Sequence, residues 1–209
     1  MIAIVDYGMG NVRSVLNAFD YLGHDAVISS DPAVIEDAER IVLPGVGAFG
    51  DAIANLRSRG LVEVLHEQVL VKKKPFLGIC LGMQLLAKSS TEHGLHEGLG
   101  WLDAEVVRFG NGNGSLNGLK IPHMGWNEIV PARDHPLLER LPAKQRSFYF
   151  VHSYHIICHD QTDSLASSEY GYKFTVAVHR ENIFATQFHP EKSQDNGLQV
   201  LQNFVTGAP

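Results

Sequence analysis

A lone cysteine framed by two glycines, at residues 78–82, limits the fold more than any other feature of this 209-residue chain. An apolar run precedes it and an amphipathic segment follows, so the order predicts a buried strand that turns sharply into a helix at Cys80. Gly78 and Gly82 stand two residues to either side, as in the G-x-S-x-G nucleophile elbow with Cys in place of Ser. The unpaired N–H groups of a helix start favour a thiolate and can donate to an oxyanion. The alternative is an inert cysteine at a tight junction, so a base elsewhere in the chain is needed to decide.

The first ninety residues alternate between apolar strand-like runs and segments with helical spacing. This rhythm predicts an α/β fold with a mostly parallel central sheet flanked by helices. The expected strands are 2–5, 26–28, 40–43 and 76–79, and the expected helices start near residues 12, 32, 51 and 81, the third one running to residue 71 with a break near Gly60. Because sites form at the carboxyl ends of parallel strands, the turns at 6–11, 44–50 and Cys80 are expected to share one pocket.

The second half of the chain favours short antiparallel strands added to this sheet. The expected strands are 104–109, 119–122, 127–130, 147–151, 156–158, 174–179 and 183–188, followed by a terminal helix over 194–205. The glycine- and asparagine-rich stretch 110–118 predicts a flexible surface loop. No linker divides the two halves, so a single domain over residues 1–209 is expected.

Charge and cysteine content exclude several classes of function. The formal net charge is −6 and the chain has no long basic run, which argues against nucleic acid or an anionic membrane as partner. The two cysteines, Cys80 and Cys158, form no disulfide framework, and no Cys/His group has zinc-ligand spacing, so neither metal nor cofactor is expected. No signal peptide or apolar run of membrane-spanning length is visible, so we expect a reducing cytoplasm.

A candidate base follows the strand-like run that ends at Phe188. His189 and Glu191 stand two residues apart, and Pro190 between them favours an extended conformation for the histidine. In an extended segment, residues i and i+2 point to the same side, so the carboxylate can orient the imidazole. The sequence therefore predicts a triad of Cys80 as nucleophile, His189 as base and Glu191 as orienter. A surface histidine beside a glutamate is the alternative for the pair taken alone.

These motifs resemble those of class I glutamine amidotransferases. The segments 78–84 and 188–192 resemble the whole superfamily, whereas 6–11, 44–50 and 123–127 are similar to the glutaminase subunits of imidazole glycerol phosphate synthase. The resemblance spans residues 6–192 and implies a three-layer, flavodoxin-like fold. It also implies hydrolysis of glutamine to glutamate and ammonia through a γ-glutamyl thioester on Cys80.

The resemblance further assigns roles around the nucleophile. The oxyanion donors are expected to be the backbone N–H of Leu81 and an N–H from Val46 or Gly47, where a peptide flip would accompany activation. Glutamine itself is expected to be held by four residues: Gln84, Glu92, Ser153 and Tyr154.

The implied partner is a (β/α)₈ barrel cyclase subunit, bound as a heterodimer. Ammonia would pass into the barrel, which makes imidazole glycerol phosphate and AICAR in histidine biosynthesis. The residues expected at this interface are Met124, Trp126, Tyr154 and Lys192. Trp126 equally fits a core aromatic of a β-rich region.

Three other functions stay open at this stage. An amidotransferase subunit for another acceptor shares the triad but not the segments 6–11 and 123–127. A stand-alone cysteine hydrolase, such as a γ-glutamyl peptidase, would act without a partner. A binding-only homologue would lack Cys80, His189 or Glu191, and all three are present.

Overall fold

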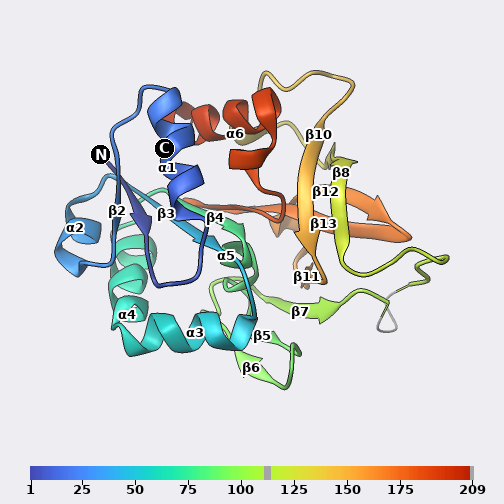
Figure 1. Ribbon diagram of the computed structural model, residues 1–209, viewed down its shortest axis with the longest axis horizontal. Coiled ribbons are helices and arrows are strands. Elements are labelled where there is room, and N and C mark those ends of the chain that lie inside the picture. The colour runs from blue at the N-terminus through green and yellow to red at the C-terminus, as the bar shows by residue number, and fades with distance from the viewer. Residues whose placement is uncertain (111–113, 208–209) are drawn as a thin grey trace.

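A central eight-stranded sheet organises the computed structural model, which describes residues 1–110 and 114–207 (Figure 1). The strand order is β2-β1-β3-β4-β14-β13-β12-β9. The first five strands in this order are parallel and the last three are antiparallel additions. Their bounds are β1 Ile2–Val5, β2 Ala26–Ser29, β3 Arg40–Gly45, β4 Phe76–Cys80, β9 Val130–Pro131, β12 Ser164–Tyr170, β13 Tyr172–Arg180 and β14 Ile183–Thr186.

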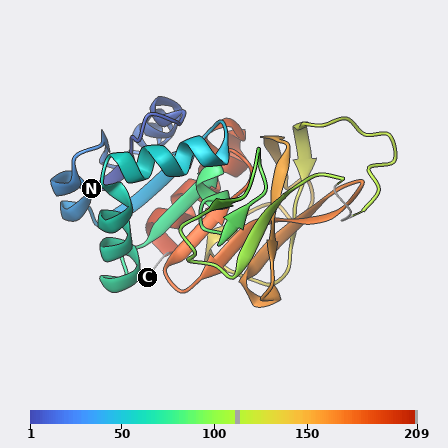
Figure 2. The same cartoon turned by 90° about the horizontal axis from the view of Figure 1, so that it is seen from below.

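Helices cover both faces of this sheet and complete three layers (Figures 1 and 2). On one face lie α1 Val12–Tyr21 and α6 Gln194–Gly207, and on the other lie α2 Pro32–Asp37, α3 Phe49–Ser58 and α4 Leu61–His66, which continues as a π-helical turn over Glu67–Val71. Along β1, Ala3 and Val5 join the core under α2–α4, whereas Ile2 and Ile4 join the core under α1 and α6. This two-residue alternation is why a nearly continuous apolar strand can supply two cores at once.

Two smaller sheets stand beside the central one. A two-stranded antiparallel sheet pairs β8 His123–Glu128 with β10 Ser147–His152. A four-stranded sheet has the order β11-β7-β5-β6, formed by β5 Ser89–Ser90, β6 His96–Glu97, β7 Ala104–Arg108 and β11 Tyr154–Cys158. The turn at Ser153 joins β10 to β11, so the chain passes directly from one small sheet to the other.

The predicted α/β architecture with a mostly parallel sheet and antiparallel additions is confirmed. The predicted helix after residue 50 does break at Gly60, which has φ 67°. The helix after the elbow is shorter than expected, because α5 comprises the single turn Leu81–Gln84. Residues 111–113 of the loop predicted at 110–118 lie outside the described part of the chain.

Two strand predictions are wrong in the second half, and one long strand was not predicted. Residues 119–122 form an irregular segment with a bend, since Pro122 has no N–H for a ladder, and β8 begins only after it. The strand expected at 127–130 is instead divided between the end of β8 and β9. The strand β12 was not predicted, because its serine-rich sequence has no β-branched residue, and its single aromatic residue, Tyr170, stands at the end of the strand.

Cys158 is a structural cysteine at the end of β11. It is buried, and burial together with the charges of Asp163 and Asp160 raises its pKa to about 12. A thiol this hard to ionise is a poor nucleophile, so Cys80 is the chemically available cysteine.

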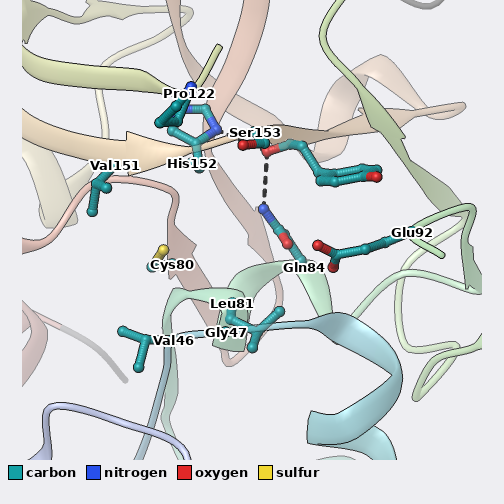
Figure 3. A pocket seen from close by; sticks show the side chains of 11 residues that line it. Val46, Gly47, Cys80, Leu81, Gln84, Glu92, Pro122, Val151, His152 and Ser153 are labelled. Atoms are coloured by element: carbon teal, nitrogen blue, oxygen red, sulfur yellow. Dashed lines mark hydrogen bonds between the residues drawn. The ribbon is translucent and has the colours of Figure 1, made fainter.

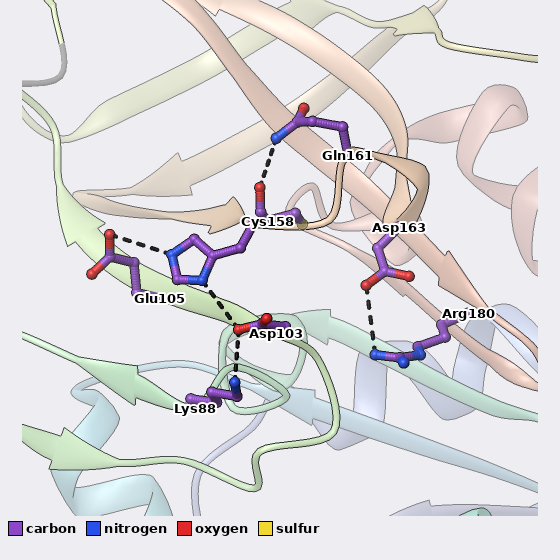
Figure 4. A network of polar contacts seen from close by, with 8 residues as sticks. Lys88, Asp103, Glu105, Cys158, Gln161, Asp163 and Arg180 are labelled. Carbon is purple, nitrogen blue, oxygen red and sulfur yellow. Dashed lines mark hydrogen bonds and ion pairs between the residues drawn. The ribbon is translucent and has the colours of Figure 1, made fainter.

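Exposed polar side chains lie on the surface beside Cys158. Lys88 and His159 both contact Asp103, at 2.8 and 3.1 Å (Figure 4).

Candidate active site

The elbow places Cys80 at the carboxyl end of β4, with β3 on one side and β14 on the other. Its backbone has φ 55° and ψ −109°, and α5 begins at the next residue. Packing explains both glycines. A side chain on Gly82 would overlap the carbonyl oxygen of Leu43, and one on Gly78 would lie 2.7 Å from the carbonyl oxygen of Gly82. The predicted strand–turn–helix geometry is therefore enforced by close backbone contacts.

A cavity of about 310 Å³ opens over the sulfur (Figure 3). It is lined by Val46, Gly47, Cys80, Leu81, Gln84, Glu92, Pro122, Val151, His152, Ser153 and Tyr154. All the residues expected to form the oxyanion hole and to hold glutamine are in this set. Residues from five separate parts of the chain thus converge on one space.

His189 and Glu191 lie behind the cysteine instead of lining the cavity. Nδ1 of His189 is 2.8 Å from Oε1 of Glu191, and both side chains are almost completely buried. The second nitrogen, Nε2, is buried without a hydrogen-bond partner among the described residues. The structure therefore leaves Nε2 for a proton exchanged with the nucleophile.

Charge decides the protonation state of His189. Burial by itself lowers the pKa of the imidazole, but the negative charge of Cys80 and the hydrogen bond and charge of Glu191 raise it to about 10. The imidazolium is thus stabilised between two acidic partners, as in an ion-paired Cys–His site. In this state the ring carries the proton that a leaving amine needs.

The 44–50 turn runs along the other side of the nucleophile. Gly45 of β3 pairs with Cys80, and Val46 and Gly47 follow it into the cavity wall. Gly47 has φ +100°, and a side chain there would lie 2.8 Å from Cε of Met9. The segment 6–11 therefore does not line the cavity as expected; it supports the 44–50 turn, with Tyr7 packed against Gly45 and Met9 against Gly47.

At the other end of the cavity, Gln84 and Glu92 present oxygen atoms (Figure 3). Nε2 of Gln84 donates to the backbone oxygen of Tyr154 and to Oε1 of Gln187, both at 3.0 Å. Oε2 of Glu92 accepts from the backbone N–H of Phe49 at 2.7 Å, which fixes the carboxylate at the start of α3. Since the amide hydrogens of Gln84 are already used, its Oε1 is the group left to face a ligand.

The residues expected at a partner interface lie on an exposed surface beside the cavity. Along β8, Met124 and Trp126 point outward and are 62% and 49% exposed, so Trp126 is not a core aromatic. The Trp126 ring packs on Tyr149, with centroids 6.2 Å apart, and Nζ of Lys192 lies 5.9 Å from the centroid of Tyr149. Tyr154 is half-buried and lines the cavity itself. We call Met124, Trp126, Tyr149 and Lys192 the β8 surface.

Two side chains of the site were not assigned a role from the sequence. Nε2 of Gln187, a fully buried side chain, donates to Sγ of Cys80 at 3.7 Å. The buried ring of His152 lies in the cavity wall and bonds the oxygen of Tyr154 at 2.8 Å. A polar side chain within the apolar run 183–188 was the available signal for Gln187. Among the described residues, no cluster of three His, Cys, Asp or Glu side chains could hold a metal ion.

Comparison with known proteins identifies the family. The profile of "Glutamine amidotransferase class-I" matches residues 3–208. The chain is 52% identical over 205 residues to "Imidazole glycerol phosphate synthase subunit HisH" of Sulfurimonas denitrificans, with 98% of this chain and 97% of the relative covered. The Methanococcus maripaludis relative named "Imidazole glycerol phosphate synthase subunit HisH 2" is 46% identical, with both chains fully covered.

The chain belongs to the class I glutamine amidotransferase family, among its HisH members. Solved structures of more distant proteins share the class I amidotransferase fold. The crystal structure of one glutamine amidotransferase superposes with a TM-score of 0.71 at 21% identity, covering 99% of this chain and 100% of that one. PurLQS from Thermotoga maritima gives 0.70 at 19% identity, covering 100% and 98%.

Proposed function

We propose that this amidotransferase is the glutaminase subunit of an imidazole glycerol phosphate synthase, acting in histidine biosynthesis. It hydrolyses glutamine to glutamate and ammonia and supplies the ammonia to a cyclase subunit. The observation that carries the chemistry is the alignment of the cavity, Cys80, His189 and the buried Glu191. The observation that carries the pathway is the near full-length similarity to HisH subunits.

The first half of the reaction forms a thioester. The Cys80 thiolate attacks the γ-carboxamide carbon of glutamine, and the carbonyl oxygen becomes an oxyanion. The N–H of Leu81 at the start of α5 is one donor for this charge, and the Val46–Gly47 segment supplies the second. His189, held as an imidazolium, gives its proton to the nitrogen, the C–N bond breaks and ammonia leaves.

The second half restores the enzyme. The now neutral His189 takes a proton from water, and the resulting hydroxide attacks the thioester carbon. The C–S bond breaks, glutamate leaves and Cys80 returns as a thiolate beside the imidazolium. Glu191 holds Nδ1 at 2.8 Å throughout, so the same imidazole nitrogen faces the sulfur in both halves.

The α-amino and α-carboxylate groups of glutamine fit the far end of the cavity. Oε1 of Gln84 and the carboxylate of Glu92 are acceptors suited to an ammonium group. The Ser153–Tyr154 backbone lines the same part of the cavity and is the segment proposed for the α-carboxylate. This orientation leaves the γ-amide directed toward Cys80.

The β8 surface is the proposed docking site for the (β/α)₈ cyclase, giving a heterodimer. Its exposed methionine and tryptophan are residue types enriched at interfaces, and Val151, which lines the cavity, pairs with Met124 across β8 and β10. A partner seated here would cover the cavity mouth and receive ammonia without release to solvent. We place the chain in the cytoplasm, where the nucleophilic thiol stays reduced.

Glutamine turnover by the purified chain, with and without the cyclase and its nucleotide substrate, tests this function. We expect low activity alone and a strong rise in the complex. Cys80→Ala should abolish glutamine use while the complex retains synthesis from added ammonia. Strong partner-independent turnover would favour a stand-alone hydrolase, and glutaminase activity in Cys80→Ala would exclude Cys80 as the nucleophile.

A further inference from the structure

The register of the sheet places one residue beside the nucleophile on each side. On β3, Gly45 pairs with Cys80. On β14, Thr186 pairs with Ile79, so Gln187 is the next residue in register and lies next to Cys80. Gly45 carries no side chain, whereas Gln187 carries a fully buried amide that reaches the sulfur at 3.7 Å.

The polarity of the Gln187 amide follows from a backbone group. The carbonyl oxygen of Tyr154 can only accept, so Nε2 of Gln84, 3.0 Å away, must donate to it. The same Nε2 lies 3.0 Å from the oxygen of Gln187 and donates its second hydrogen there. The oxygen of Gln187 is thereby occupied, and its N–H is turned toward Sγ of Cys80.

The carbonyl oxygen of Tyr154 also determines the tautomers of His152 and His123. Nδ1 of His152 is 2.8 Å from it and therefore carries a hydrogen. Burial lowers the pKa of His152 to about 3, so the ring is neutral and its Nε2 is an acceptor. Nδ1 of His123, 3.0 Å from that nitrogen, must be the donor.

The hydrogen-bonded chain ends at β8. Burial lowers the pKa of His123 to about 4, so its Nε2 is also an acceptor and takes a hydrogen from the amide of Asn127 at 3.2 Å. That amide is oriented independently, since its oxygen accepts from the N–H of Glu128 at 2.8 Å and its nitrogen donates to the oxygen of Glu169 at 2.8 Å. The hydrogen bonds from Asn127 to His152 therefore all point toward the carbonyl oxygen of Tyr154, where they meet the hydrogen bond that Gln84 donates from the other side.

We propose that Gln187 is a positioning residue for Cys80, oriented by Gln84, which the carbonyl oxygen of Tyr154 orients in turn. His152, held by His123 and Asn127, donates to the same carbonyl oxygen from the other side. The amide holds the sulfur in one rotamer and donates to it, which favours the thiolate over the thiol. A largely buried hydrogen-bond network of this kind favours one geometry of the Gln187 amide. The role concerns the glutaminase reaction and so rests on the proposed function.

The test compares the rate at which iodoacetamide alkylates Cys80 at neutral pH in the full-length chain, followed by mass spectrometry of the Cys80 peptide. Gln187→Met keeps the side-chain length and removes the donor. We expect alkylation to slow about tenfold, since hydrogen bonds to charged groups are worth roughly that factor or more. In the cyclase complex, kcat for glutamine should fall by about the same factor with KM little changed.

Two further variants separate positioning from general damage. Gln68→Met makes the same change at another buried glutamine, in the π-helical turn, and should leave both rates at the wild-type value. Gln84→Met combined with Gln187→Met removes both partners of one bond, so the core stays satisfied while the donor to sulfur is lost. It should also be alkylated slowly.

Whether the alkylation rate of Cys80 falls or rises in the variants decides between positioning and general damage. A loosened site would expose the thiol and speed alkylation, so unchanged or faster alkylation in a cooperatively melting variant overturns the proposal. Loss of cooperative melting in the double variant also overturns it, because the amides would then serve the core and not the thiol. Alkylation needs no glutamine, so the two proposals can fail separately. If the wild-type chain hydrolyses no glutamine but Gln187→Met is still alkylated slowly, the proposed function is wrong and the role of Gln187 stands.

Discussion

Glu191 accepts a 2.8 Å hydrogen bond from His189 in a place where both side chains are at most 2% exposed. A carboxylate buried to this degree is stable only because the imidazolium neutralises it. The pair is therefore a preformed part of the site and not an accident of two surface residues close in sequence.

Glu191→Gln should reduce kcat for glutamine by about 10²–10⁴-fold, with a much smaller effect on KM. The amide cannot stabilise the imidazolium, so the pKa of His189 falls and less of the proton donor is present. Steady-state kinetics of the cyclase complex measure this. Glu181→Gln, which alters an exposed glutamate paired with Lys73, is the control and should match wild type. An equal loss of activity in both variants would contradict the assignment.

Gly82→Ala should destabilise the chain by about 3 kcal/mol or more, because the new methyl group overlaps the carbonyl oxygen of Leu43 in the core of the sheet. Gly23→Ala is the matched control, since it has open space around it and meets only the cost of φ +77°. That cost is about 1 kcal/mol. Urea unfolding compares the two, and similar losses would mean that close packing at the elbow is not what requires glycine.

The double change Met124→Ala and Trp126→Ala should weaken cyclase binding at least about tenfold while leaving the melting temperature of the isolated chain nearly unchanged. Both side chains are exposed, so their loss costs little core packing. Calorimetric titration with the cyclase provides the measurement. Tyr21→Ala, at the exposed end of α1, should bind as wild type. Undiminished affinity in the double variant would move the docking site away from the β8 surface.

Stability should fall as the pH drops below about 6.5. His123 and His152 are buried and neutral, with pKa values lowered to about 4 and about 3, whereas a histidine of the unfolded chain has its ordinary pKa of 6.5. Below about pH 6.5 the unfolded state therefore binds more protons, and each histidine removes up to about 1.4 kcal/mol of stability per pH unit. The effect ends only when the folded pKa is reached.

Urea unfolding of wild type and His123→Gln between about pH 7 and pH 5 tests this linkage. The unfolding free energy of the variant should depend less steeply on pH, because glutamine does not titrate and unfolding of the variant takes up about one proton fewer. His66→Gln, at an exposed histidine of α4, should follow the wild-type curve. Parallel curves for wild type and His123→Gln would show that the buried ring does not control the acid sensitivity.

The sequence was most informative where the site is local. Cys80 between two glycines and the His189–Glu191 pair each sit within five residues, so local geometry alone predicts their arrangement. Gln187 was missed because its partner lies more than a hundred residues away on the neighbouring strand, and only the register of β4 and β14 brings them together. The ring of His152 was missed for a similar reason, since its partner His123 is brought opposite to it only by the pairing of β8 with β10.

The strands likewise differ in whether local sequence or neighbouring strands determine their conformation. Apolar strands of the parallel half have a strong pattern, and each was predicted close to its observed position. β12 has small, weakly strand-forming residues that are buried because β13 and β9 lie on either side of it. Its conformation is imposed by neighbours, which is information that a local pattern does not contain.

The backbone of Cys80 has φ 55°, a value that costs a residue with a side chain about 1–3 kcal/mol and costs glycine almost nothing. Cys80→Gly should therefore melt at a higher temperature than wild type while being inactive. A laboratory selection for thermal stability alone would enrich substitutions at position 80 and discard the enzyme. Only simultaneous selection for histidine prototrophy would keep the cysteine, so the two selective pressures act in opposite directions on a single residue.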